Sequence, residues 1–257
     1  MHIEEKLNSL KSTALVSYVM AGYPDLDTTY EIIDSLIKSG SDVIELGVPF
    51  SDPSADGKAI QLAAEYALAK NISIDDCFNL VKKIELEHPD IPVILMGYFN
   101  PIFNYGIDKF IIDANKAGVK GLIIVDLPFE EHKHYPKLFN SKIPIINLIT
   151  PATIGTRLEK ILSSAKGFLY YISVFGITGT KTPDLEKANK EAKRLKNLTN
   201  KKIGLGFGIK SKDQIKQIEN NFDLVIIGSA YCKIINEFKA NKEKLLVEIR
   251  KFNLSLR

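Results

Sequence analysis

Cysteine is scarce in this sequence. The two cysteines, Cys77 and Cys232, stand far apart and form no CxxC pair. A disulfide-stapled scaffold or a zinc site built on paired cysteines is therefore not expected. Free thiols persist in a reducing compartment, so the cytoplasm is the expected location.

Long apolar runs and a strong net charge are also missing. No stretch approaches the roughly 20 apolar residues that a membrane-spanning helix needs. The first residues, MHIEEKLNSLKS, are polar and acidic, unlike a signal peptide. The net charge is +3 with the basic residues spread along the chain, which does not indicate a nucleic-acid surface. We expect no contact with membranes or nucleic acid.

What the chain does contain is a repeated pattern of short apolar runs. Most are β-branched or leucine-rich without clean alternation, which is typical of parallel strands covered on both faces. The runs lie at 14–20, 42–48, 92–97, 121–127, 144–150, 168–173, 202–207 and 224–229. Amphipathic segments that predict helices lie between them, among them 27–40, 73–88, 106–118 and 211–221, with room for an extra helix at 58–70.

Eight strand–helix units in one chain of this length predict a (β/α)8 TIM barrel. We expect a single domain over residues 1–257, with one extra helix at the N-terminus and one after the second strand. No linker or shift in composition marks a boundary. A doubly wound open sheet is the alternative, but it usually has fewer strands and a glycine fingerprint after the first.

The stretch VIELGVPFSDPSADG, residues 43–57, places a carboxylate inside an apolar strand. Burying the Glu45 carboxylate without a partner costs free energy. Glu45 therefore either has a structural hydrogen-bond partner or serves the function of the protein. Alone, Glu45 is as consistent with a structural role as with catalysis, and Asp52 and Asp56 are typical turn residues. In a barrel, however, the strand ends and the loops after them carry the catalytic groups. This placement favours Glu45 and Asp56 as functional acids.

Glycines follow the last two predicted strands. The segments GLGFGIKS (204–211) and VIIGSAYCK (225–233) place Gly206, Gly208, Gly228 and Ser229 where barrels frequently bind phosphate. Small residues let backbone N–H groups approach an anion, and a helix N-terminus adds partial positive charge. The loop SVFGITGTKTP (173–183), with Thr178 inside it, is a third phosphate contact, a mobile lid or simply a long glycine-rich surface loop.

Three further features have structural and functional interpretations. Asp126 after the fourth strand is either a third acid or a structural strand-end residue. His132 and His134 form an H-x-H pair at a polar helix start, which indicates a solvated pair more than a metal site. Of Tyr170 and Tyr171, adjacent on one strand, only one can point into the barrel.

Several motifs, in this order, resemble the tryptophan synthase alpha chain family over essentially the whole chain. They are ELGVPFSDPSADG, MGYFNPIFNYGID, VDLPFEE, SVFGITGTK, GFGIKS and GSAYCKII. The resemblance implies a lyase that splits indole-3-glycerol phosphate into indole and glyceraldehyde 3-phosphate, without metal or organic cofactor. Ser54, Lys58 and Met20 depart from common versions of the pattern.

The resemblance also implies roles for individual residues. Glu45 and Asp56 fall on the two catalytic carboxylates. The phosphate-binding positions are Gly179, Gly208, Gly228 and Ser229, with Thr178 beside them, and the indole pocket comprises Tyr18, Met96, Tyr98, Leu148, Tyr170 and Phe207. A beta-chain partner in an α2β2 heterotetramer is implied as well. The segments 49–57 and 100–106 are expected to form the docking face as surface loops, with Phe50, Phe99, Ile102 and Phe103 either exposed there or folded inward to cap the barrel.

Two other functions remain open from the residues. One is a standalone lyase for the same substrate. The other is a different phosphate-binding barrel acting on a sugar phosphate, for which catalytic Lys, Asp or His residues at strand ends would be expected, and no predicted strand ends in such a lysine.

Overall fold

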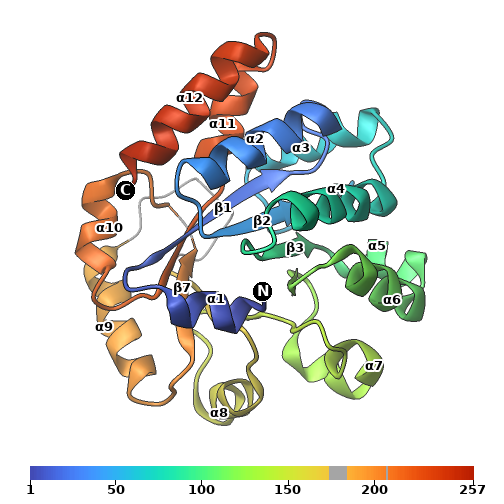
Figure 1. Cartoon of the computed structure of the whole chain (residues 1–257). Coiled ribbons are helices and arrows are strands. Elements are labelled where there is room, and N and C mark those ends of the chain that lie inside the picture. Colours follow the sequence, from blue (N-terminus) through green and yellow to red (C-terminus); the bar gives the residue numbers. More distant parts are fainter. Residues whose placement is uncertain (174–183, 207) are drawn as a thin grey trace.

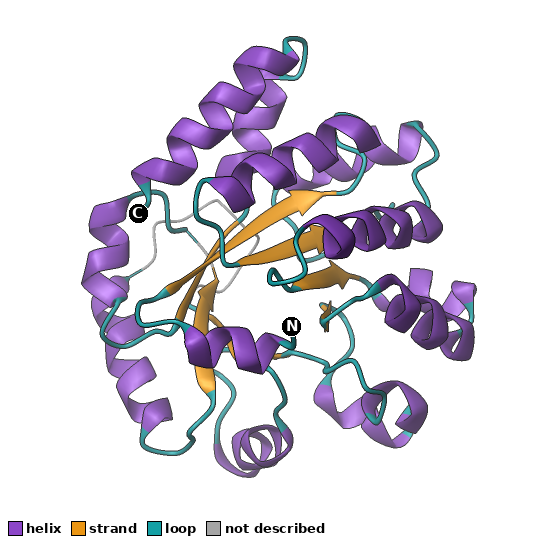
Figure 2. Cartoon of the chain, in the orientation of Figure 1, coloured by secondary structure: helices purple, strands orange, loops and turns teal. Residues whose placement is uncertain are grey.

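Eight parallel strands form a nearly closed barrel in the computed structural model, which describes residues 1–173, 184–206 and 208–257 (Figure 1, Figure 2). Their order is β4-β3-β2-β1-β8-β7-β6-β5, so the first strand pairs with the last. The TIM barrel is confirmed, and the open doubly wound sheet is wrong. The strands are β1 Ala14–Met20, β2 Val43–Gly47, β3 Val93–Gly97, β4 Gly121–Ile124, β5 Asn147–Ile149, β6 Phe168–Ile172, β7 Lys202–Gly206 and β8 Leu224–Ile227.

The barrel closes least completely between β4 and β5. An isolated bridge joins Leu122 to Ile145 there, with Leu122 N–H donating to Pro144 O (2.9 Å) and Ile146 N–H to Leu122 O (2.8 Å). The fifth strand, expected over 144–150, is reduced to Asn147–Ile149. Pro144 has no N–H to donate, so it joins this junction through its carbonyl alone.

Helices surround the barrel (Figure 2). The extra helices at the N-terminus (α1) and after β2 (α3) are both present. Residues 100–106, expected as a surface loop, instead fall largely in helix α5, with Pro101 in the first turn, where its missing N–H costs nothing. The helices are α1 Ile3–Ser9, α2 Leu26–Lys38, α3 Lys58–Ala69, α4 Ile74–Glu87, α5 Phe99–Tyr105, α6 Ile107–Ala117, the 3₁₀ helix η1 Phe129–Lys133, α7 Pro136–Phe139, α8 Gly155–Ser164, α9 Leu185–Lys196, α10 Lys212–Ile218, α11 Ser229–Phe238 and α12 Lys242–Ser255.

Short polar residues set where several of these helices begin. The side chain accepts a hydrogen bond from an N–H of the first turn and so satisfies a group that the helix itself leaves free. Asp25, Ser73, Asp184, Ser211 and Asn241 cap α2, α4, α9, α10 and α12 in this way.

The core has two layers because successive strand residues point to opposite faces. The inner layer fills the barrel, and the outer layer joins the strands to the helices. Tyr170 belongs to the inner layer and Tyr171 to the outer one, as expected for adjacent residues. Helix α1 lies across one end of the barrel (Figure 1), where Ile3 and Leu7 join the inner layer and cover it.

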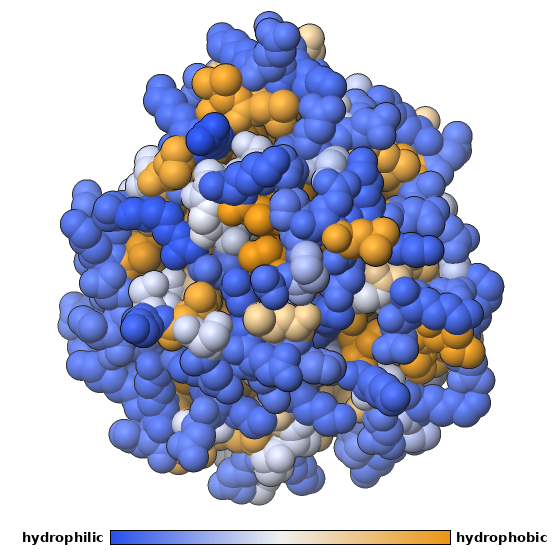
Figure 3. All heavy atoms as spheres, viewed as in Figure 1, coloured by the Kyte–Doolittle hydropathy of each residue, from blue (hydrophilic) through white to orange (hydrophobic). Residues whose placement is uncertain are grey.

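The surface in view is largely hydrophilic, with hydrophobic side chains in small separated groups (Figure 3). Among the described residues, none of the helices combines the length and the apolar character needed to cross a membrane.

Candidate active site

Glu45 lies at the centre of β2, paired in register with Tyr18 on β1 and Ile94 on β3. Its side chain is 1% exposed, and its Oε2 has no hydrogen-bond partner among the described residues. Burial, with a smaller contribution from the nearby charge of Asp56, raises the pKa of Glu45 to about 8. The carboxyl group therefore holds its proton at neutral pH.

Asp56 lies in the loop between β2 and α3 and is 5% exposed. Its Oδ1 is also without a partner in the part of the chain that is described. Burial raises the pKa of Asp56 to about 6, while the hydrogen bond from the Tyr98 hydroxyl opposes this rise. Asp56 is consequently ionised at neutral pH, when Glu45 is not.

The Tyr98 hydroxyl binds the loop between β2 and α3 that carries Asp56. It accepts a hydrogen bond from Ala55 N–H (3.1 Å) beside its contact with the Asp56 carboxylate. The Tyr98 ring lies 5.2 Å from that of Phe50, and Gln61 Nε2 donates to the Asp56 carbonyl (2.8 Å). The loop is held at both its start and its end, so the carboxylate has a defined position.

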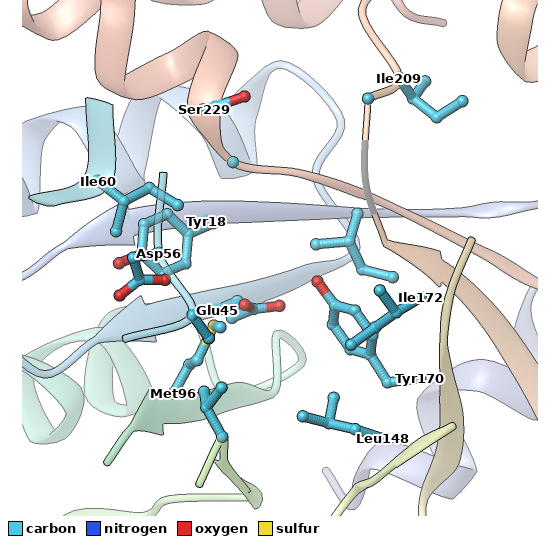
Figure 4. A pocket seen from close by; sticks show the side chains of 15 residues that line it. Tyr18, Glu45, Asp56, Ile60, Met96, Leu148, Tyr170, Ile172, Ile209 and Ser229 are labelled. Atoms are coloured by element: carbon cyan, nitrogen blue, oxygen red, sulfur yellow. The ribbon is translucent and has the colours of Figure 1, made fainter. Parts of the chain in front are cut away.

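Both carboxyl groups face one cavity, part of which is open to solvent. Its lining is mostly apolar with a few polar groups among it, which is the usual composition of a small-molecule site. Figure 4 shows Asp56 and Tyr18 on one side of Glu45, with the Tyr170 hydroxyl directed towards it from the other. The lining is Tyr18, Glu45, Ala55, Asp56, Ile60, Met96, Val125, Leu148, Tyr170, Ile172, Gly208, Ile209, Ile226, Gly228 and Ser229.

Most of the residues singled out from the sequence meet in this cavity. Tyr98 lines a smaller adjoining hollow with Tyr18, Asp56 and Met96 rather than the main cavity. Thr178, Gly179 and Phe207 lie outside the described residues. Sequence reasoning missed six lining residues, of which Val125 and Ile172 were findable because they lie at or just past strand ends. The six are Ala55, Ile60, Val125, Ile172, Ile209 and Ile226.

Two glycines on the barrel wall make room for tyrosine rings. A side chain on Gly47 would overlap the ring and hydroxyl of Tyr18, and one on Gly206 would overlap those of Tyr170. Gly206 was expected to serve an anion, but it does not line the cavity. Its role in the structure is to let the Tyr170 ring lie across β7.

Gly208, Gly228 and Ser229 line the cavity at the N-terminus of α11. Gly208 has a φ of +80°, a conformation that side chains rarely adopt. Gly228 caps the ten-residue helix, and Ser229 is its first residue. Unsatisfied N–H groups and the helix dipole suit an anion at this end of the cavity.

Asp126 and the His132–His134 pair, the other candidates from the sequence, lie outside the cavity. Asp126 Oδ1 accepts a hydrogen bond from Phe99 N–H (2.7 Å) at the start of α5, so Asp126 caps that helix. His132 stacks on Phe129 with its Nδ1 3.0 Å from the Phe129 carbonyl, whereas His134 is exposed. Neither feature contributes to the cavity.

Comparison with known proteins identifies the family of this chain. The family model for the tryptophan synthase alpha chain matches residues 5–256. The tryptophan synthase alpha chain of Petrotoga mobilis is 44% identical over 247 residues, covering 96% of this chain and 95% of that one. An alpha chain from Acinetobacter baumannii is 42% identical over 230 residues, covering 89% of this chain and 86% of its own length.

Solved structures give the same answer. Tryptophan synthase subunit alpha from Legionella pneumophila superposes with a TM-score of 0.90 at 36% identity, covering 100% of this chain and 97% of that one. A Mycobacterium tuberculosis tryptophan synthase chain gives 0.89 at 31% identity, covering 99% and 96%. These matches favour neither of the alternative functions. The chain belongs to the tryptophan synthase alpha chain family.

Proposed function

We propose that this chain cleaves indole-3-glycerol phosphate into indole and glyceraldehyde 3-phosphate, with Glu45 and Asp56 as the catalytic residues. The observation that carries the proposal is a pair of buried carboxyl groups in one cavity with pKa values of about 8 and about 6. Two acids whose environments separate their pKa values are suited to different tasks at one pH.

The reaction is a retro-aldol cleavage, and Glu45 serves both of its proton transfers. Protonated Glu45 donates its proton to the indole ring carbon that bears the side chain. The resulting carboxylate accepts the proton of the adjacent side-chain hydroxyl as the carbon–carbon bond breaks, so the hydroxyl carbon becomes the aldehyde and indole leaves. Glu45 ends protonated again, so the step consumes neither water nor an external proton.

Asp56 stabilises the ring during this step. Protonating the ring carbon places positive charge on the indole, and the indole N–H becomes a stronger donor. An ionised Asp56 accepts that hydrogen bond, and its free Oδ1 supports this assignment. Tyr98 helps because its hydroxyl opposes the rise in the Asp56 pKa.

The remaining cavity residues bind the two ends of the substrate. The phosphate lies at Gly208, Gly228 and Ser229, where the start of α11 supplies N–H groups. Gly179 and Thr178 are proposed to add contacts there. The indole ring lies against an apolar wall formed by Tyr18, Met96, Leu148, Tyr170 and, by resemblance, Tyr98 and Phe207.

The test is indole release by the purified chain. We expect indole and glyceraldehyde 3-phosphate in equal amounts from indole-3-glycerol phosphate, measured by indole absorbance and a coupled dehydrogenase assay. Addition of EDTA should leave the rate unchanged, because the proposed step uses protein carboxyl groups alone. Absence of indole with the chain folded and the beta chain present would overturn the function.

We further propose a beta-chain partner in an α2β2 heterotetramer, docking over residues 49–57 and 100–106. Phe103 is 55% exposed on α5. Ile102 is buried, and the Phe99 ring centroid lies 4.6 Å from that of Tyr135. These two side chains therefore pack inward rather than facing a partner. Asp56 belongs to the first of these segments, so docking on it acts directly on a catalytic residue.

Titrating a cognate beta chain should raise the steady-state rate of indole release. A bias of 1.4 kcal/mol towards the active loop position is worth about tenfold, and we expect an increase of at least that size. Pro53→Gly and Asn104→Ala should reduce the increase, and heat-denatured beta chain should give none. Fast turnover by the free chain, unchanged by the partner, would instead identify a standalone lyase.

The chain is proposed to form a single barrel domain over residues 1–257. It is also proposed to act in the cytoplasm. Cys77 and Cys232 are both free and buried, which is consistent with a reducing compartment.

A further inference from the structure

A buried polar cluster lies behind the cavity wall, on the outer face of β1. Its members are Ser17, Ser41, Tyr231 and Asn253, all no more than 3% exposed. The Ser17 and Ser41 hydroxyl oxygens are 2.7 Å apart, and the Ser17 hydroxyl is 3.2 Å from that of Tyr231. Polar groups buried this deeply are costly unless they are satisfied, so the cluster indicates a defined arrangement.

Asn253 on α12 completes the cluster. Its Oδ1 accepts a hydrogen bond from the Tyr231 hydroxyl. Its Nδ2 donates to the Leu36 carbonyl (3.1 Å) and to the Ser39 hydroxyl (2.9 Å) at the end of α2. The Tyr231 ring also packs edge-on against Phe252, with centroids 5.4 Å apart. Tyr231 thus joins α11 to both β1 and α12.

The position of Tyr231 along its helix gives the cluster a functional meaning. Tyr231 is the third residue of α11, and Ser229, the first, lines the cavity. On the strand side, Ser17 precedes Tyr18, and successive strand residues point to opposite faces, so the Tyr18 ring lines the same cavity from the other face of β1. The Tyr231 hydroxyl is therefore bonded to the barrel wall and to α12 within one turn of the anion end of the cavity.

We propose that Tyr231 is a positioning residue for substrate phosphate. Its hydroxyl, held between Ser17 and Asn253, sets the location of the first turn of α11 relative to β1. The N–H groups of that turn can bind a phosphate only where the helix start is correctly placed. The inference rests on the proposed function, since it assigns the phosphate to Gly228 and Ser229.

The variant that tests this is Tyr231→Phe, which keeps the ring and removes the hydroxyl. Ser17 and Ser41 still pair, and Ser41 remains 3.5 Å from Asn253 Oδ1, so the variant should fold. A displaced helix start loses part of its charge–dipole attraction for the phosphate. We expect the KM for indole-3-glycerol phosphate and the Ki of inorganic phosphate to rise about five- to tenfold, with kcat within about twofold.

Tyr23→Phe is the matched control. The Tyr23 ring is buried, and its hydroxyl donates to Asn236 Oδ1 (2.9 Å) further along the same helix, in a partly buried hydrogen bond. Tyr23→Phe loses this one bond to α11 without touching the first turn. KM and the phosphate Ki of Tyr23→Phe should stay within about twofold of those of the unsubstituted chain.

Indole-3-glycerol, the substrate without its phosphate, separates positioning from general damage. The Tyr231→Phe and unsubstituted chains should cleave it with equal kcat/KM, because the proposed defect acts through the phosphate alone. Equal losses on both substrates, or equal effects of Tyr231→Phe and Tyr23→Phe, would overturn the inference while the function stands. If the unsubstituted chain released no indole and bound no phosphate, the proposed function would fall first.

Discussion

Glu45→Gln is expected to bind the substrate and release almost no indole. Glutamine keeps the shape of the side chain but can neither give up nor take up a proton at the ring carbon and the hydroxyl. General acid–base catalysis contributes about 10²- to 10⁴-fold, and because Glu45 serves both transfers we expect kcat to fall by at least the upper figure. The Kd for an indole-propanol phosphate analogue should change little, since neither the phosphate end nor the apolar wall is altered.

Single-turnover kinetics and analogue titration measure the two effects separately. Glu65→Gln, an exposed position on α3, is the matched control and should keep full activity. Burial raises the pKa of Glu45 from 4.5 to about 8, so between these two values Glu45 is ionised in the unfolded chain and protonated in the folded one, and the unsubstituted chain loses stability as the pH rises through this window. Glu45→Gln removes this loss and should be no less stable than the unsubstituted chain at pH 8. Near-normal turnover by Glu45→Gln would remove Glu45 from the mechanism.

Asp56→Asn should also be severely impaired, through a different step. An asparagine at this position accepts the indole N–H bond without a negative charge, so the developing ring cation loses its counter-charge. Losing a preorganised electrostatic partner of this kind costs about 10²- to 10³-fold in kcat. Asp52→Asn, in the same loop but exposed, should leave the kcat of the chain without its partner unchanged.

The pH dependence identifies the two acids. Below about 6, Asp56 takes up a proton and loses the charge that the ring needs; above about 8, Glu45 loses the proton that it must donate. The kcat/KM of the unsubstituted chain should therefore peak near neutrality and fall on both sides. Residual activity of Asp56→Asn should lack the acid limb. Because phosphate also titrates near 6, the Ki of glycerol 3-phosphate must be followed over the same range; an acid limb that persists in Asp56→Asn would assign it to the phosphate.

Much of the fold follows from hydrophobic pattern. All eight strands were predictable because parallel strands between two core layers are apolar on both faces. The late start of β5 and the open junction beside it were not, since they depend on how this segment meets its neighbouring strand. Helix α5 was missed because Pro101 and Gly106 indicate a loop, whereas Pro is compatible with a first helical turn.

The site residues likewise fall into those that the sequence could predict and those that it could not. Glu45 could be singled out because a carboxylate in an apolar strand is rare, and Asp56 because it lies in the loop after that strand; glycines after the last two strands likewise indicate an anion site. The role of Gly206 could not be predicted, because nothing in the neighbouring sequence shows that the Tyr170 ring lies across it. Likewise, Ile60 and Ile209 read as ordinary apolar residues, and their place in the cavity depends on how their loops and helices return to the barrel.

The two tyrosine–glycine pairs bear on how this pocket can be redesigned. Tyr18 with Gly47, and Tyr170 with Gly206, each occupy one shared volume on neighbouring strands. A larger residue at either glycine is blocked while its tyrosine remains, and shrinking the tyrosine alone opens a hole in a close-packed wall. Single-site libraries will therefore find few improved variants at these four positions. The tyrosine and the glycine of each pair have to be randomised together, as one unit of selection, if the enzyme is to accept a substrate with an altered indole ring.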